Sequence, residues 1–293
     1  MILIKGTTKN KGQKDILDKF YTNEDVAKKI IKKVDDIYKD RNPIYLEPSA
    51  GAGAFSKNIK NCISLDIKPE DSSIRKQDFF KYDWKDFKDS DFIITIGNPP
   101  FGQNGKTALD FFKKSTEKSD IIAFILPRSF MKDTFINKIP TNYHLINGPR
   151  GDILDLNSFN FKENEYSIPT CFQIWERRDN QRKIIKKISF ENNIIEFTTK
   201  DKADFRIQRV GGNAGKASKD LNRSIQSNYF IKNISNFSND YLIEKINNLI
   251  FPTIEFTTGP KSLSKQELIM TIKEAFSNEW KTKSWIEIWR LFI

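Results

Sequence analysis

The sequence has very little cysteine or histidine. Its two cysteines, Cys62 and Cys171, lie in separate apolar runs, and His144 is its one histidine. Zinc sites and disulfide frameworks need several such residues at short spacings, so we expect neither a metal nor a disulfide. His144 precedes a short apolar run, which favours an ordinary strand residue over a member of a catalytic triad.

Long hydrophobic runs are also missing. No run reaches the roughly 18 apolar residues that a membrane span needs. The chain begins with Met1–Ile4 and then turns to lysines, which is not the pattern of a signal peptide. We therefore expect no membrane association and a reducing compartment inside the cell, either the cytoplasm or the nucleoid or nucleus.

Basic residues exceed acidic ones. Lysine and arginine number 49 against 38 aspartates and glutamates, giving a net charge of +11 and a pI of about 9.4. Such a balance favours a polyanionic partner, because basic surfaces attract phosphates. A solvated, lysine-rich surface is the other interpretation of the same numbers.

Short apolar runs alternate with longer amphipathic stretches, which is typical of an α/β fold. Two later runs follow each other without a convincing helix and are expected to form a hairpin that closes the sheet. The predicted strands are 44–46, 62–66, 92–96 and 121–126, and the later runs are 143–146 and 170–175.

Composition divides the chain into three parts. Residues 1–18 are lysine-rich and aperiodic, which predicts a flexible basic arm. Residues 19–178 carry the α/β pattern, and residues 179–293 form a smaller part that is more basic per residue. Ser264 and Glu267 form a capping box that predicts the start of a last helix. The later Trp280, Trp285 and Trp289 are expected in the core of the small domain.

The first strand runs into a turn of small residues, Glu47-Pro48-Ser49-Ala50-Gly51-Ala52-Gly53. Gly51 and Gly53 let the backbone approach a ligand where a Cβ atom would collide. Glycine-rich turns also occur in dinucleotide sites and in plain turns, so this motif alone leaves the ligand open.

Acidic residues follow at the ends of later segments. Asp66 ends the second strand, where a carboxylate in a βαβ unit accepts both hydroxyls of a ribose. Asp78 is placed to accept from an adenine amino group while Phe79 packs against the ring. An ordinary turn residue is the alternative for Asp78.

The sharpest motif is Asn98-Pro99-Pro100-Phe101, directly after the third strand. Two consecutive prolines remove two backbone donors and stiffen the chain, so the loop presents acceptors. Asn98 adds a side-chain carbonyl, and Phe101 offers a flat face on which a base could stack.

These motifs together resemble those of the class I S-adenosylmethionine-dependent methyltransferases that modify adenine N6, in the gamma-type motif order. The resemblance covers about residues 18–178, and it implies a Rossmann-like seven-stranded sheet followed by a smaller C-terminal target-recognition region. It implies a site-specific, adenine-specific DNA methyltransferase of the restriction-modification kind. The implied target loop is Asn98, Pro99, Pro100 and Phe101, and the implied cofactor residues are Phe20, Tyr21, Thr22, Glu47, Pro48, Ala50, Gly51, Gly53, Asp66, Asp78 and Phe79.

The resemblance also implies how the loop would work. Oxygen acceptors from Asn98 and Pro99 would draw the two hydrogens of the amine into the geometry that attack on a sulfonium methyl needs. Because that amine lies inside a duplex, the base must be flipped out and held, against Phe101.

A basic, glycine-containing segment in the smaller part does not match a phosphate-binding loop, because Val210 and Ala217 stand where that pattern needs glycine and serine or threonine. We interpret it as a surface that contacts nucleic acid, with a solvated loop as the alternative. The expected contact residues are Arg206, Arg209, Lys216, Lys219 and Arg223.

Several alternative functions remain open to different degrees. An RNA adenine methyltransferase would share the loop chemistry, and a non-catalytic nucleic-acid-binding relative would be expected to lose one motif, whereas both are intact. Cytosine-N4 enzymes usually have serine at the position of Asn98, and protein glutamine methyltransferases usually have tyrosine at that of Phe101, which argues against both. The sequence does not decide whether a separate restriction endonuclease exists, nor the oligomeric state.

Overall fold

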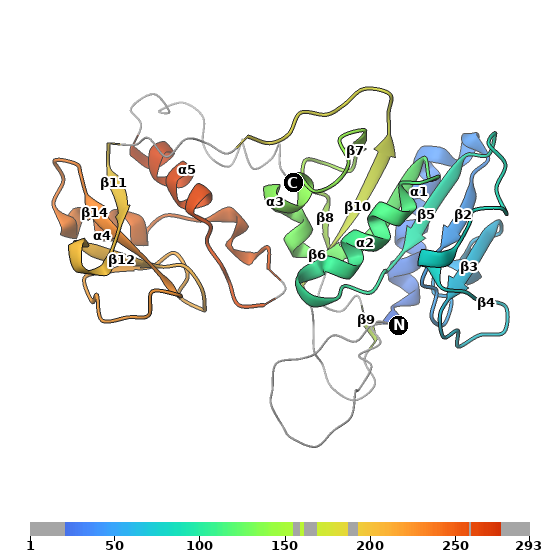
Figure 1. Cartoon of the computed structure of the whole chain (residues 1–293), viewed down its shortest axis with the longest axis horizontal. Coiled ribbons are helices and arrows are strands. Elements are labelled where there is room, and N and C mark those ends of the chain that lie inside the picture. Colours follow the sequence, from blue (N-terminus) through green and yellow to red (C-terminus); the bar gives the residue numbers. More distant parts are fainter. Residues whose placement is uncertain (1–20, 155–158, 161–168, 187–192, 258, 277–293) are drawn as a thin grey trace, which may run out of the picture. The chain divides into compact units, whose positions relative to one another are not determined.

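The computed structural model describes residues 21–154, 159–160, 169–186, 193–257 and 259–276 (Figure 1). The contacts divide the chain into two compact units, one that ends at Ile184 and one that begins at Ile185. The sequence placed this boundary near residue 178. The expected arm, residues 1–18, lies outside the described residues.

The first unit is an α/β structure built on a mixed eight-stranded sheet. Seven strands follow the order β4-β3-β2-β5-β6-β10-β7, and β8 pairs with β10. Pairing is parallel from β4 to β6, whereas β10 runs antiparallel to its neighbours. The strands are β2 (Ile44–Glu47), β3 (Cys62–Asp66), β4 (Arg75–Lys76), β5 (Ile93–Gly97), β6 (Ile121–Pro127), β7 (Tyr143–Leu145), β8 (Asp152–Leu154) and β10 (Thr170–Arg177).

The central strands are buried along their whole length. Every residue of β5 and β6 is buried, as expected for parallel strands that are covered on both faces. The predicted strands agree with these bounds to within two residues. The two late runs pair antiparallel, with Trp175 opposite Leu145. The sequence missed β4 and β8, whose two and three residues are too short to carry a pattern.

The first helix begins at a local signal in the sequence. Helix α1 (Glu24–Tyr38) is capped by Asn23, whose side chain accepts from the backbone N–H of Asp25 at 2.9 Å. Its buried residues include Ile30 and Val34. The remaining helices are α2 (Lys106–Ser115), α3 (Asp133–Ile136) and the short 3-10 turns 39–41, 56–58, 79–81, 103–105 and 128–131. A two-residue strand β1 (Tyr21–Thr22) pairs with β9 (Phe159–Asn160).

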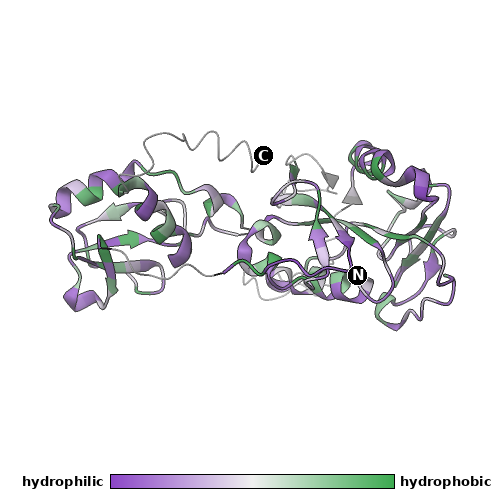
Figure 2. Ribbon diagram, turned by 90° about the horizontal axis from the view of Figure 1, so that it is seen from above, coloured by the Kyte–Doolittle hydropathy of each residue, from purple (hydrophilic) through white to green (hydrophobic). Residues whose placement is uncertain are grey.

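The second unit contains a separate four-stranded antiparallel sheet in the order β11-β14-β12-β13. Its strands are β11 (Ile195–Thr198), β12 (Phe205–Gln208), β13 (Ala217–Ser218) and β14 (Asn228–Asn233), and its helices are α4 (Asn239–Asn247), α5 (Lys265–Phe276) and the 3-10 turns 200–202 and 252–255. The core includes Ile207 and Ile231 from the sheet and Leu242 and Leu268 from the helices. Figure 2 shows that the helices of both units carry both hydrophobic and hydrophilic residues.

Helix α5 begins where the capping box predicted. The Ser264 hydroxyl accepts from the backbone N–H of Glu267 at 3.1 Å. Trp280, Trp285 and Trp289 lie outside the described residues. Within the described part of the chain, no helix combines the length and the apolar character that a bilayer crossing requires. The same residues contain no cluster of side chains that could hold a metal ion.

Candidate active site

The parallel sheet changes direction beside β2. The chain passes from β2 to β3 and β4 on one side, and then returns to add β5 on the other side of β2. Loops that leave the carboxyl ends of two such strands diverge, and open α/β sheets bind ligands in the resulting crevice. The turn after Glu47 and the loop after Gly97 are these two loops.

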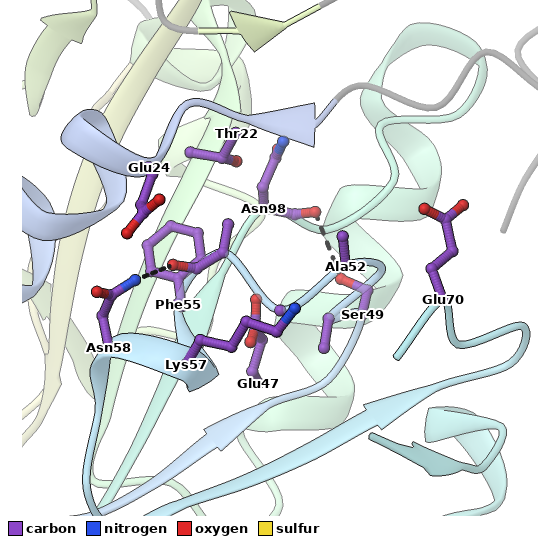
Figure 3. Close-up of a pocket in the computed structure, with 13 residues that line it drawn as sticks. Thr22, Glu24, Glu47, Ser49, Ala52, Phe55, Lys57, Asn58, Glu70 and Asn98 are labelled. Carbon is purple, nitrogen blue, oxygen red and sulfur yellow. Dashed lines mark hydrogen bonds between the residues drawn. The ribbon is translucent and has the colours of Figure 1, made fainter. Parts of the chain in front are cut away.

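A pocket of about 480 Å³ lies at this crevice (Figure 3). Three carboxylates, from Glu24, Glu47 and Glu70, line it together with a single cation, from Lys57. This excess of negative charge favours a positively charged ligand. The complete lining is Thr22, Glu24, Glu47, Ser49, Ala50, Ala52, Gly53, Ala54, Phe55, Lys57, Asn58, Glu70 and Asn98.

Glu24 and Lys57 form ion pairs with residues outside the pocket lining. Glu24 forms an ion pair with Lys28 at 2.8 Å, and Lys57 forms one with Asp71 at 2.7 Å. Both pairs are partly exposed, so water screens them. Glu47 is different, because only 2% of it is exposed.

Glu47 is a buried carboxyl group at the floor of the pocket. It accepts from the backbone N–H of Ser56 at 2.8 Å. Burial raises its pKa to about 7, although the Ser56 N–H opposes the rise. Gly97 lies beside it, where a Cβ atom would make an ordinary contact of 3.5 Å with Glu47 Cγ, and it is the φ of 149° that favours glycine at this position.

Asp66 holds the glycine turn in place. One oxygen accepts from the Gly51 N–H and the other from the Lys68 N–H, each at 2.7 Å. Gly51 and Gly53 have φ of 55° and 84°, which glycine adopts without strain. Asp66 is 7% exposed and does not line the pocket. In the described structure it is therefore not placed to accept from the hydroxyls of a ribose in this pocket.

Glu70 takes the place at the pocket that Asp66 was expected to fill. Its backbone N–H donates to the Gly51 carbonyl at 3.0 Å, which brings it beside the glycine turn. Figure 3 shows its side chain on the side of the pocket near Ser49 and Ala52. The sequence signal was a second acid four residues beyond Asp66, and the spacing argument overlooked it.

Asp78 and Phe79 also lie apart from the pocket lining. Asp78 accepts from the Phe80 N–H at 3.0 Å and so begins a 3-10 turn, which is the turn role left open by the sequence. Phe79 is 2% exposed and packs between Trp84 and Phe111, with ring centroids 5.9 and 5.3 Å away. Its ring is part of the core, because these apolar neighbours enclose it.

The Asn98 loop reaches the pocket through its first residue. Asn98 lines the pocket with its side-chain oxygen buried, and its backbone carbonyl accepts from the Ser49 hydroxyl at 3.4 Å (Figure 3). Pro99 is buried and Pro100 is half-buried. Phe101 is 6% exposed and is not among the lining residues, in contrast to the open stacking face expected of it.

The remaining predicted cofactor residues have mixed outcomes. Thr22, Ala50 and Gly53 line the pocket, whereas Pro48 and Gly51 belong to the same turn but do not line it. Phe20 lies outside the described residues, and only the backbone of Tyr21 is described, in β1. The sequence missed Glu24, Ser49, Ala52, Ala54, Phe55, Lys57 and Asn58, because an ordinary cap or turn residue gives no chemical signal of its own.

The basic residues predicted to contact nucleic acid differ in exposure. Arg206 is 8% exposed, and its guanidinium donates to the Asp220 carbonyl and the Asn228 side chain, so it braces the second unit from inside. Three more are exposed but have partners. Lys216 donates to the Asn247 carbonyl, Lys219 pairs with Asp240, and Arg223 pairs with Asp220. Arg209 lies over the ring of Tyr229.

Gly102 shapes the end of the Asn98 loop. Its φ is 67°, and a Cβ atom there would lie 2.7 Å from Thr107 Cβ. We expect Gly102→Ala to lower the free energy of unfolding by about 2 kcal/mol, as the sum of a left-handed backbone and a clash. Urea denaturation measures this, with Gly212→Ala as the control, because a Cβ atom there meets nothing within 4 Å. Equal losses in the two variants would contradict the steric role of Gly102.

No protein family model matches this chain, and no curated protein matches it either. The function is therefore argued from the pocket, its charge and the two loops that form it.

Proposed function

We propose that this chain transfers a methyl group from S-adenosylmethionine to N6 of adenine in DNA. The observation that carries the proposal is that Asn98 and the turn after Glu47, far apart in the sequence, line one pocket. The Asn98 loop accounts for binding of a target amine, and the turn after Glu47 accounts for binding of the cofactor. Methyl transfer requires the amine and the cofactor to lie in contact.

The sheet supports the same proposal. A Rossmann-like seven-stranded sheet is what the resemblance to class I methyltransferases implies. The seven-stranded path from β4 to β7, with parallel strands in the middle and β10 antiparallel near one edge, agrees with it, and β8 is an additional strand.

The charge of the pocket suits this cofactor. S-adenosylmethionine carries a sulfonium and an ammonium group, and the bound cofactor would supply an electrophilic methyl. Glu47 and Glu24 would hold its positive end by charge, while Ala50 and Gly53 leave room for close backbone approach. In this proposal Asp66 positions the turn, and Glu70 accepts from hydroxyl groups of the cofactor.

The chain's own part in the reaction is to hold an amine. The side-chain oxygen of Asn98 and the carbonyl oxygen of Pro99 accept its two hydrogens, which turns the nitrogen lone pair out of conjugation with the ring. No strong base is needed for this step. Stacking against Phe101 requires its ring to turn out of the 6% exposed position, and the buried side-chain oxygen of Asn98 must become accessible to the amine. The bound state therefore differs from the described one at these two residues.

DNA sequencing tests this proposal directly. The chain is expressed in cells that have no adenine methylation of their own, and their DNA is read for N6-methyladenine. We expect methylated adenine in a fixed sequence context. Methylation of the cellular RNA alone would replace DNA by RNA as the substrate, and the absence of methylation from both would refute the proposal.

A further inference from the structure

Two positive side chains of the second unit lie against one aromatic ring. The guanidinium of Arg209 is 5.4 Å from the ring centroid of Tyr229, and Nζ of Lys265 is 5.9 Å from the same centroid. Lys265 also lies 4.6 Å from the ring centroid of Phe197. We call Arg209, Lys265, Tyr229 and Phe197 the Tyr229 cluster.

Backbone contacts hold the Tyr229 cluster together. The Leu263 N–H donates to the carbonyl of Arg209 at 2.8 Å, and the Tyr229 hydroxyl donates to the carbonyl of Leu263 at 2.9 Å. The rings of Phe197 and Tyr229 meet edge to face at 5.3 Å. Strands β11, β12 and β14 and the start of α5 are thereby joined, so both cations have a fixed support.

Arg209 and Lys265 differ from three nearby cations because those three form ion pairs with acidic side chains. Among the described residues, neither Arg209 nor Lys265 forms an ion pair, whereas Lys219, Arg223 and Lys261 pair with Asp240, Asp220 and Glu255. The acid near the ring is Glu267, and its carboxylate accepts from the Thr253 N–H at 2.8 Å.

The guanidinium of Arg209 and the ammonium of Lys265 repel each other because both are positive. An anion that contacts both groups would reduce this repulsion. Lys265 is exposed, and it is the first residue of α5, where the helix dipole adds positive potential. Arginine presents a planar fork of donors that suits phosphate oxygens, and lysine presents a mobile point charge. These properties of Arg209 and Lys265 favour a phosphate ligand at the Tyr229 cluster.

We propose that Arg209 and Lys265 bind phosphodiester groups of the nucleic acid from their place on the rings of Tyr229 and Phe197. This rests on the proposed function for the identity of the polyanion. It changes the expected interface, because Lys265 joins Arg209 while Arg206, which is buried, and Lys216, Lys219 and Arg223, which have partners, contribute less.

Binding of a fluorescein-labelled DNA duplex to the full-length chain tests the proposal by fluorescence polarisation over a series of salt concentrations. Arg209→Ala and Lys265→Ala are each expected to weaken binding roughly three- to tenfold and to lower the slope of log affinity against log salt by about 1. Lys265→Arg keeps the charge and is expected to bind as the parent chain does. Circular dichroism melting checks that each variant is folded.

The matched control is Lys261→Ala, an exposed lysine close before α5 whose charge Glu255 already meets. It is expected to change affinity less than about twofold at a given salt concentration, on the scale of a single screened pair. An equal loss in Lys261→Ala and Lys265→Ala would overturn the proposal, because net charge alone would then account for both. Unchanged affinity and slope in Arg209→Ala and Lys265→Ala would overturn it as well.

Failure of the two proposals is distinguishable. Binding of S-adenosylmethionine and methyl transfer are measured on the same preparations. If the parent chain binds DNA through Arg209 and Lys265 but transfers no methyl group, the proposed function fails and the phosphate site stands. If it methylates DNA while both variants bind normally, the phosphate site fails and the proposed function stands.

Discussion

Asn98→Ala is expected to reduce methyl transfer to DNA by about 10²- to 10³-fold in kcat, the range for removal of one preorganised polar contact to a transition state. The side chain lines the pocket and carries an oxygen acceptor that alanine lacks. Binding of S-adenosylmethionine should change less than about threefold, because the proposed cofactor contacts come from the turn after Glu47. Single-turnover kinetics measures the first quantity and isothermal titration calorimetry the second.

Asn58→Ala is the matched control for this variant, because Asn58 is an asparagine of the same pocket whose amide donates to the Ala54 carbonyl at 3.0 Å. It should retain transfer within about threefold. Comparable losses in both variants would show that any polar deletion in the pocket suffices, which would remove the special role of Asn98.

Glu47→Gln has the second large expected effect, on the pH dependence of cofactor binding. Burial raises the pKa of Glu47 to about 7 in the free protein. A cationic ligand in the pocket favours the ionised carboxylate and lowers that pKa, so binding releases a proton. The affinity of the parent chain for S-adenosylmethionine should therefore rise by about tenfold between pH 6 and pH 8. Glu47→Gln should bind more weakly at the upper end and show no such rise.

The same shift has a consequence for stability with a definite sign. The pKa of Glu47 is raised from 4.5 to about 7 on folding. Its protonation therefore stabilises the fold fully below about pH 4.5, and this contribution is lost as the pH rises to about 7. Relative to the parent chain, Glu47→Gln should gain stability over that interval. Glu24→Gln is the control, because the Lys28 ammonium lowers the pKa of Glu24, and the stability contributed by a carboxyl whose pKa is lowered is not lost as the pH rises. A pH-independent difference between Glu47→Gln and the parent would contradict the burial of a titrating carboxyl.

Much of the first unit followed from the sequence because its central strands, β5 and β6, are buried throughout. Residues 121–126 form an unbroken apolar run that only a covered strand or helix could use, and the strand there is buried from Ile121 to Pro127. The turn after Glu47 was recognised because closely spaced glycines permit backbone conformations that other residues avoid. The loop after Gly97 was recognised because consecutive prolines restrict the backbone. Strand order required three-dimensional pairing, which spacing along the chain does not contain.

The roles of single polar residues were harder to predict. Asp66 ends β3 as expected, but its oxygens accept from two backbone N–H groups and Glu70 lines the pocket instead. Both residues are acids beside the same strand end, and only the path of the turn separates them. Phe101 was expected to be open, yet the fold around it buries its ring.

The sequence also did not show which basic residues of the second unit are exposed and unpaired by acids. The sequence identifies Arg206, Lys219 and Lys265 equally as cations, but one is buried, one is paired and one lies exposed on aromatic rings. Exposure and pairing come from contacts between segments that are distant in the chain. In our proposal the nucleic-acid surface therefore gains Lys265, and the buried Arg206 contributes less to it.

The central claim is that the pocket brings an adenine amine to a methyl donor. Its most direct test incubates the purified chain with S-adenosylmethionine that carries an isotopically labelled methyl group, together with DNA, and identifies the labelled nucleoside by mass spectrometry after digestion. We predict label in N6-methyldeoxyadenosine, formed about 10²- to 10³-fold more slowly in the Asn98→Ala reaction. Label in N4-methyldeoxycytidine, or equal label with the parent chain and Asn98→Ala, would contradict the claim.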